Sequence, residues 1–472
     1  MAAIAGVVNQ CLMNRIDTCD LEPVLSRDRQ PIQSAMTADA APFDTGRATQ
    51  VRATFRHAVR EALDLLVALA IASMCLISAM VLSNWGLAYE ATNGTVLEKL
   101  HPGSWMVFLA FGLAMLGSGN PARFLDGIVK RQPGLLVFLL TFALAFWQLV
   151  FVQNAGFTPL IDTFLMPVAL TVLLGRMEER WKRRIAVFMH IFFAANALLG
   201  LYEFLTGFRL TPFVAGTVLI EGDWRSTALL GHPLANAVVT GCYVVAICGG
   251  GARELPGLSR VLAVGLQMAG MIAFGGRSSL VIMLLFVVVS AGRQLALFGA
   301  GARKISLPQA ALVAVALPLL CGAVAAIAQG GFFDLLAGRF VDDNGSAQAR
   351  IIMLRLFEVI SLPDLMFGPD QSHIHSLQQL EGIEYGLESF WLATILGYGL
   401  IVSLIFFSGL FAFLYELAKG STAGGTHVLL FFFIIASTSV SLSAKTHVFG
   451  LVVAIILVLL RKPPATARHT GY

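Results

Sequence analysis

The stretch GLLVFLLTFALAFWQLVFV, residues 134–152, decides the fold class, because it runs for nineteen residues without a charge. A helix of that length is about long enough to cross a hydrocarbon core roughly 30 Å thick. The strands of a membrane barrel would instead alternate polar and apolar residues. The stretch therefore predicts a transmembrane helix.

Similar uncharged runs recur along the 472 residues, of which 57% are apolar and only 13% are charged. The mean hydropathy of +0.78 lies outside the range of soluble domains. The sequence thus predicts an all-α polytopic membrane protein with about twelve transmembrane helices. We expect these spans near residues 62–83, 104–118, 134–152, 157–174, 185–205, 233–249, 261–275, 279–292, 307–327, 394–415, 427–442 and 448–460.

The distribution of lysine and arginine predicts the orientation of these spans. With the N-terminus inside, twenty-one basic residues fall on the cytoplasmic side, five of them in RMEERWKRR at 176–184. The positive-inside rule favours this topology and predicts that both termini are cytoplasmic. Short basic clusters between apolar runs do not indicate a nucleic-acid partner. The short outer loops would hold only Lys99, Arg209, Arg225, Arg277 and Lys445.

The chain divides into three expected regions. Residues 1–60 lack a sustained period and predict a mostly disordered cytoplasmic arm. Residues 61–460 form the helical bundle, and residues 461–472 form a cytoplasmic tail. One outer loop, 328–390, is far longer than the others, which is typical of a functional segment. Within it, residues 346–360 have apolar positions at helical spacing and predict an amphipathic helix near the membrane surface.

The six cysteines show neither a disulfide framework nor the spacing of metal ligands, so we expect no metal and no cofactor. The informative residues are instead basic residues placed against the charge rule. Arg277, in GGRSS at 275–279, lies between two apolar spans and is a candidate for ligand contact. Its small neighbours would let a ligand approach the backbone. Arg225 and His232 precede the sixth expected span on the same side, although helix anchoring and helix capping also explain them.

Several motifs occur together in an order typical of one family. WRSTALLGHPLANA (224–237) is followed by GGRSS (275–279), by NGSAQARIIMLRLFEVISLPDLMFG (344–368) and by ESFWLATILGYGLI (388–401). This arrangement resembles the O-antigen ligase and polymerase superfamily of bacterial envelope enzymes, and most of all its VpsF-type exopolysaccharide branch. Each motif alone is weak, and the motif-bearing part covers residues 223–400.

The resemblance implies a metal-independent membrane glycosyltransferase of GT-C architecture in the bacterial inner membrane, with a periplasmic active site. Its substrate would be an oligosaccharide linked to undecaprenyl diphosphate, and its other partners would be membrane lipids and other polysaccharide assembly and export proteins. The family's arginines fall on Arg225 and Arg277. The family's loop His-Asn pair aligns with Glu388 and Ser389, which is a departure from the pattern.

The chemistry of breaking a sugar–diphosphate bond agrees with this implication. Fixed cations must stabilise the negative charge on the leaving group, and guanidinium groups bind phosphate oxygens in pairs. Lys445 offers a further phosphate contact. A carboxylate or imidazole must accept the proton of the attacking hydroxyl, and the candidates are Glu388 and the loop residues His373 and His375 of SHIHSL.

Substrate-positioning roles fall to His232, Arg350 and Asp162, although Asp162 also fits a simple helix-dipole role. Polymerase and ligase reactions share this donor chemistry, and the resemblance favours a polymerase. A transporter would also have many spans, but it should show internal repeats, and the sequence shows none. A structural scaffold for an envelope complex would not need Arg277.

Overall fold

The computed structural model describes residues 45–90, 94–215, 218–220, 223–301, 346–383, 387–439, 442 and 444–462. The chain divides into two compact units, residues 1–56 and 57–472. The expected span 307–327 and the first part of the 328–390 loop lie outside the described residues. Helix α2 (Thr45–Leu76) already begins within the expected N-terminal arm, so the last part of that arm is helical.

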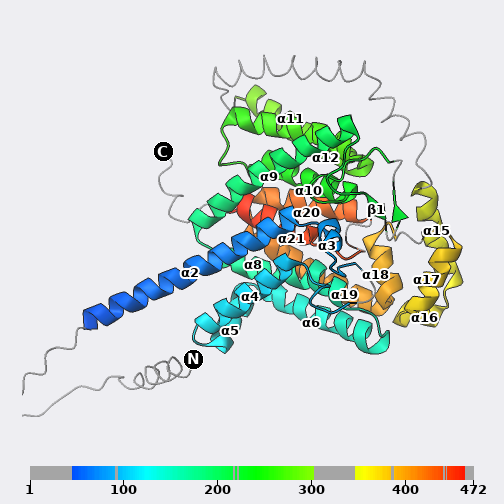
Figure 1. Ribbon diagram of the computed structural model, residues 1–472, viewed down its shortest axis with the longest axis horizontal. Helices are drawn as coiled ribbons and strands as arrows, with labels where there is room; N and C mark the ends of the chain where they lie inside the picture. The colour runs from blue at the N-terminus through cyan, green and yellow to red at the C-terminus, as the bar shows by residue number, and fades with distance from the viewer. Residues whose placement is uncertain are drawn as a thin grey trace, which may run out of the picture. The chain divides into compact units, whose positions relative to one another are not determined.

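The rest of the first half is helical, with two five-residue π-helical turns (Figure 1). A proline at position 167 removes the N–H that an α-helix would bond to the carbonyl of Thr163, and the wider turn η2 lies there. The elements are α3 (Ala79–Asn84), α4 (Pro102–Gly117), α5 (Pro121–Arg131), α6 (Pro133–Trp147), η1 (Gln148–Val152), α7 (Thr158–Leu160), η2 (Ile161–Leu165), α8 (Met166–Arg176) and α9 (Glu179–Thr206).

A two-stranded antiparallel hairpin of β1 (Val214–Ala215) and β2 (Val218–Leu219) follows α9. The remaining described elements are again helical. They are α10 (Pro233–Cys248), α11 (Gly257–Phe274), α12 (Arg277–Gly299), α15 (Ser346–Val359), α16 (Leu362–Phe367), α17 (Gln371–Leu380), α18 (Phe390–Tyr398), α19 (Leu400–Gly420), α20 (Ala423–Ala436), α21 (Val448–Ala454) and the π-helical turn η3 (Ile455–Leu459).

Six helical segments of the described residues are long and apolar enough to cross a membrane, and a seventh arises if α4 and α5, bent by 112°, are one span. Three further apolar helices, 233–248, 423–436 and 448–459, are shorter. Much of the apolar surface faces outward: in α12 only 11% of the most apolar stretch is buried against protein. An apolar face of this kind suits lipid, so the chain is a helical membrane protein. The count of twelve spans stays a prediction.

Small residues bring the helices into close contact. At the α6–α19 contact, a side chain on Gly409 would collide with Thr141, and one on Gly134 would collide with the backbone of Ala412. Between helices in lipid, close van der Waals packing replaces the hydrophobic effect as the main attraction, and small residues permit it. Phenylalanines fill the remaining space, and Phe164 contacts the rings of Phe390, Phe406 and Phe449.

The expected span 394–415 is broken in two. Gly399 separates α18 from α19 with φ of 81°, a backbone conformation that favours glycine. The backbone of 366–368, at the end of α16, lies directly against Gly399 and leaves no room for a side chain. The amides of Gln148 and Gln153 donate to the carbonyls of Phe367 and Gly397, at 2.6 Å each. These two hydrogen bonds therefore connect the segment that follows α6 both to the described part of the loop and to the end of α18.

Helices α15, α16 and α17 lie together beside α18 and α19 (Figure 1). They share a small hydrophobic core of Met353, Leu356, Ile360, Ile374, Ile383, Leu387 and Leu396. The predicted helix at 346–360 exists as α15, and Met353 and Leu356, one turn apart, turn into this small core. Ile351 and Leu354 remain exposed on the opposite side.

Candidate functional site

Glu203, at the end of α9, anchors the segment that carries the WRSTA motif. Its buried carboxylate accepts hydrogen bonds from the Ser226 hydroxyl (2.5 Å) and from the backbone N–H groups of Thr227 (3.0 Å), Ala228 (2.9 Å) and Leu210 (2.9 Å). A carboxylate that accepts so many donors fixes the path of the chain. The conformation of residues 226–228 is therefore set from α9.

Two buried asparagines hold the same segment, and one of them, Asn196, lies two turns before Glu203 on α9. The Asn196 amide donates to the side chain of Asn236 at 2.9 Å, and its oxygen accepts from the backbone of Leu229 at 3.0 Å. Asn236 donates to the carbonyl of Thr227 at 2.6 Å. The segment is thus hydrogen-bonded to both α9 and α10.

Arg225 lies against the turn that precedes Arg277. The Ser226 N–H donates to the carbonyl of Ala273 at 2.9 Å, and the aliphatic part of Arg225 lies over Gly275, whose φ is 67°. Arg277 is the first residue of α12 and is half-buried. The structure thus brings the two predicted phosphate-binding arginines to one turn.

The space beside the two glycines of this turn is filled by other residues of the protein. The expectation that these glycines let a ligand approach the backbone is therefore wrong. Arg225 covers Gly275, and Ala237 at the start of α10 leaves no room for a side chain on Gly276. The small residues serve the packing of α12 on α10. Any ligand contact at this turn must therefore come from side chains.

Asp223 pairs with Arg225, and sequence analysis did not single it out. Its carboxylate accepts from Nε of Arg225 at 2.7 Å and from Nη2 at 2.5 Å, with the two side chains 12% and 17% exposed. The guanidinium also lies 5.1 Å from the ring centroid of Phe213. Two of its five N–H donors are thus used by Asp223.

His232 caps α10, as one of the two interpretations of the sequence expected. Its Nδ1 accepts from the N–H of Leu234 at 3.2 Å, and its ring packs edge-on against Phe213. Burial, with the nearby charge of Arg225, lowers the pKa of His232 to about 4. At neutral pH the ring is therefore uncharged and used for the cap.

A second group of predicted residues meets at the starts of α4, α21 and η2. Asp162 is completely buried and accepts from the Tyr89 hydroxyl (3.0 Å) and from the backbone of His101 (3.1 Å). Lys445 donates to the Tyr89 carbonyl at 2.6 Å. The rings of His101 and His447 lie 4.5 Å apart. Asp162 is enclosed by protein and can act on a substrate only through Tyr89 and Lys445.

The two groups are joined through the segment between α2 and α3. Nε2 of His101 donates to the carbonyl of Ile77 at 2.8 Å, in the ring tautomer whose Nδ1 accepts from Gly103. The next residue, Ser78, lies directly against Gly231 of the WRSTA segment. The starts of α4, α10, α12 and α21 therefore lie at one end of the bundle, which we call the site end.

The loop residues are placed differently from one another. Glu388 is half-buried and precedes α18, whose first residue Phe390 contacts Phe164 in η2, so α18 also begins at the site end. His373 and His375 are exposed on α17. Arg350 lies on α15. Glu388 thus lies two residues before the start of a helix packed on the η2 turn that carries Asp162, whereas both histidines lie on α17.

The helix starts themselves favour anions at the site end. Each helix N-terminus presents unpaired N–H groups and carries about half a positive charge. Five starts meet here together with Arg225, Arg277 and Lys445. Diphosphate oxygens suit such a field.

Sequence analysis missed the residues that hold these cations. Tyr89 and His101 lie far along the chain from Lys445 and Asp162, so no spacing relates them. Asp223 lies only two residues before Arg225, and this close acidic–basic spacing was a usable signal. Asn196 and Asn236 did carry a signal, because an amide inside an apolar span needs a hydrogen-bonding partner.

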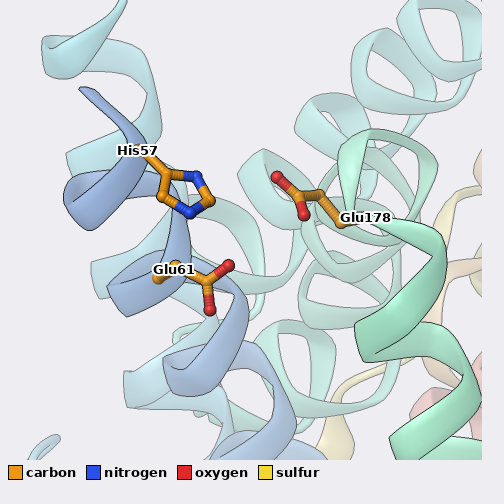
Figure 2. Close-up of side chains that lie close together, drawn as sticks. All are labelled: His57, Glu61 and Glu178. Atoms are coloured by element: carbon orange, nitrogen blue, oxygen red, sulfur yellow. The ribbon is translucent and has the colours of Figure 1, made fainter. Parts of the chain in front are cut away.

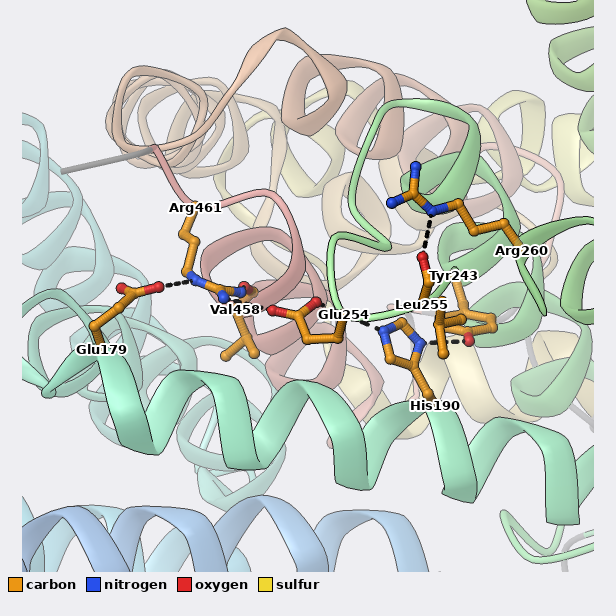
Figure 3. A network of polar contacts seen from close by, with 8 residues as sticks. All are labelled: Glu179, His190, Tyr243, Glu254, Leu255, Arg260, Val458 and Arg461. Carbon is orange, nitrogen blue, oxygen red and sulfur yellow. Dashed lines mark hydrogen bonds and ion pairs between the residues drawn. The ribbon is translucent and has the colours of Figure 1, made fainter. Parts of the chain in front are cut away.

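The opposite end of the bundle carries a buried ion network, shown in Figure 3. Arg461 pairs with Glu179 and with Glu254, its Nη2 lying 2.5 Å from Oε1 of Glu254. The other oxygen of Glu254 is 3.8 Å from Nε2 of His190, whose Nδ1 contacts the Tyr243 hydroxyl at 2.7 Å. We call this the basic end.

His57, Glu61 and Glu178, also at the basic end, are close enough together to hold a metal ion (Figure 2). However, Arg180 pairs with both Glu61 and Glu178, and Arg60 lies 3.4 Å from Glu178. Two arginines already neutralise the two carboxylates. This cluster is therefore best explained as an ion-pair contact between α2 and the start of α9.

Comparison with known proteins adds no relative to these observations. No protein-family model matches the sequence, and no curated protein matches it closely enough to count as a relative.

Proposed function

We propose that this chain polymerises oligosaccharide repeat units carried on undecaprenyl diphosphate, at the outer face of a bacterial inner membrane. The observation that carries the proposal is the meeting of Arg225 and Arg277 at one turn of the site end. The resemblance of the motifs to the O-antigen ligase and polymerase superfamily supports it further.

The reaction forms one bond and breaks another at the same carbon. A hydroxyl of the acceptor sugar attacks the anomeric carbon of the donor, and the bond from that carbon to the diphosphate oxygen breaks. The electron pair leaves with the diphosphate, and the hydroxyl proton passes to a base. Arginine side chains at the site end would hold the diphosphate and stabilise its increasing charge.

Glu388 is the proposed base. It is the one of the three candidates that lies half-buried beside a helix packed on η2, whereas His373 and His375 are exposed on α17. A base must come within about 3 Å of the proton that it accepts, so a position next to the cations is required.

Deletion of the gene in its native host tests the reaction class. Loss of a polymerase leaves single repeat units on the lipid, and these remain open to a glycosidase added to the outer face. Loss of a ligase leaves full-length polymer on the lipid. Loss of a transporter leaves single repeats that the outer enzyme cannot reach. The second or third outcome would contradict the proposal.

A matched pair of arginine variants connects the phenotype to the site end. Re-expression of Arg277→Ala should fail to restore polymer at normal protein level. Arg260→Ala should restore it, because Arg260 donates to the Leu255 carbonyl in the loop that carries Glu254, at the basic end.

A further inference from the structure

Lys445, between α20 and α21, is held on two sides by one residue. Its Nζ donates to the Tyr89 carbonyl at 2.6 Å and lies 3.6 Å from the centroid of the Tyr89 ring. Tyr89 itself is only 2% exposed, whereas Lys445 is half-buried. An ammonium group over a ring face is attracted to it even where water is partly excluded. Because Lys445 is only half-buried, part of its side chain reaches the surface of the described residues.

Tyr89 is in turn fixed from behind. Its hydroxyl donates to Asp162, and Asp162 also accepts from the backbone at the start of α4. The carboxylate has no exposed surface. Asp162 is therefore a positioning residue, which acts on Lys445 through Tyr89.

The other titratable groups around Lys445 divide into charged and neutral ones. Asp162 and Glu90 are acidic and Lys99 is basic. Burial lowers the pKa values of His101 and His447, so both rings are neutral at pH 7. At this pH the two imidazole rings therefore add no charge, and the ammonium group held against Tyr89 is that of Lys445.

We propose that Lys445, in the loop between α20 and α21, is the cation of an anion site that is positioned by Tyr89 and Asp162 and binds the phosphate group of a lipid. The lipid would be either the diphosphate-linked donor or an anionic phospholipid. Only the first of these two sources rests on the proposed function.

The charge on this site depends on pH. Burial lowers the pKa of Lys445 to about 8, while the charges of Asp162 and Glu90 raise it and that of Lys99 lowers it. The site holds its cation below pH 8 and loses it as the pH rises above that value. Phosphate binding should weaken over the same range.

The test is the rate at which an amine-reactive reagent labels Lys445 in the purified full-length protein, measured by mass spectrometry in neutral-lipid nanodiscs. Undecaprenyl diphosphate or phosphatidylglycerol is then added in separate samples. Protection of Lys445 by at least about threefold at pH 7, weaker at pH 9, supports the site, and the lipid that protects identifies the source. Lys130, which is exposed and paired with Asp126, serves as the unprotected control.

Three charge variants, with opposite expected signs, and one hydrogen-bond variant test the site. Asp162→Asn and Glu90→Gln should move the midpoint of the labelling profile to lower pH, and Lys99→Met should move it to higher pH. Tyr89→Phe keeps the ring and the carbonyl but loses the bond to Asp162, and it should raise the lipid concentration needed for half-protection by roughly 2- to 10-fold. A merely structural role for Asp162 would lower the protein yield without moving the midpoint.

Protection by neither lipid would overturn the anion site. If either lipid protects Lys445 in a protein that proves to make no polymer, the site stands and the proposed function fails. If polymer is made and neither lipid protects Lys445, the proposed function stands and the anion site fails.

Discussion

Arg225 and Arg277 illustrate how one residue type can be placed in two different ways. The guanidinium of Arg225 is already paired with Asp223, and its stem lies over Gly275. Arg277 begins α12 and is half-buried. Substitution of Arg225 should therefore disturb packing as well as charge.

Arg277→Lys should be nearly as damaging to polymer formation as Arg277→Ala. A lysine ammonium is a single point of charge and cannot reproduce the two parallel bonds of a guanidinium to a diphosphate. Polymer yield at matched protein level is the measurement, with Arg260→Lys as the control. Full activity of the lysine variant would show that any positive charge suffices.

Glu388→Gln should lower the rate of polymer formation by about 10²- to 10⁴-fold, the usual contribution of a general base. A carboxylate that merely follows the helix dipole would contribute only about 0.3–1 kcal/mol, so the two roles differ in magnitude. His373→Asn and His375→Asn should be mild, because both rings are exposed on α17. Initial rates in reconstituted membranes measure all three. Severe loss in a histidine variant alone would move the catalytic role to α17.

At the scale of the element, the sequence predicted most helices, but it did not predict where an apolar run is broken into two helices. Helix α4 covers 102–117 where 104–118 was expected, because both charge-free length and the proline at its start are visible in the sequence. The break at Gly399 was not predicted. Its cause is the backbone at 366–368, which reaches it only in the folded chain.

The candidate site was predictable to a similar extent. The cations were found because a basic residue on the outer side violates the expected charge distribution. Their partners were not found. Tyr89 lies 356 residues from Lys445 in the chain and only the fold brings the two together. Asp223 is two residues from Arg225 but looks like an ordinary acidic loop residue. The meaning of Gly275 was also misjudged, because the Arg225 side chain covers it.

The network at the basic end predicts a large loss of stability when the ion pair between Arg461 and Glu254 is broken. Arg461 and Glu254 are 8% and 7% exposed, so Arg461→Met leaves a buried carboxylate without its partner and should cost about 3–5 kcal/mol. Arg461→Met combined with Glu254→Gln should cost less than the sum of the two single changes. Glu179→Gln is the control, since Glu179 is 45% exposed and should contribute about 0–1 kcal/mol. Denaturant unfolding in detergent measures these differences, and additive single effects would contradict the coupling.

The same pair gives the stability a pH dependence. Burial opposes the ionisation of Glu254, but the hydrogen bond and charge of Arg461 outweigh it and hold the pKa of Glu254 below its usual range. A lowered carboxyl pKa stabilises the fold above the unfolded value of about 4.3 and ceases to do so as the pH falls through the folded value. In Glu254→Gln, the free energy of unfolding should therefore fall less steeply as the pH is lowered through this range.

At the scale of the whole molecule, contacts sort the charged loops into two ends. The starts of α4, α10, α12, α18 and α21 meet at the site end, and Glu179, Glu254, Lys419 and Arg461 meet at the basic end, where Lys462 donates to the Lys419 carbonyl. The positive-inside rule predicts that the basic end faces the cytoplasm. The choice of the cytoplasmic side rests on the charge distribution alone. The contacts separately require that all residues of one end lie on the same side of the membrane.

Single-cysteine labelling tests both statements together. In intact cells, with the native cysteines replaced, a membrane-impermeant thiol reagent should label Arg209→Cys and Gln371→Cys but not Arg180→Cys or Lys419→Cys. Permeabilised cells should label all four. In the reverse pattern, Arg180→Cys and Lys419→Cys would be labelled in intact cells and the other two sites would not. This result would agree with the two-ended fold but would place the Arg225 and Arg277 turn in the cytoplasm. The proposed polymerisation, which uses lipid carriers at the outer face, would then have no substrate there. A mixed pattern, with Arg180→Cys and Lys419→Cys on different sides, would contradict the fold itself, because α9 and α19 reach the same end through the contacts of Arg461 with Glu179 and of Lys462 with Lys419.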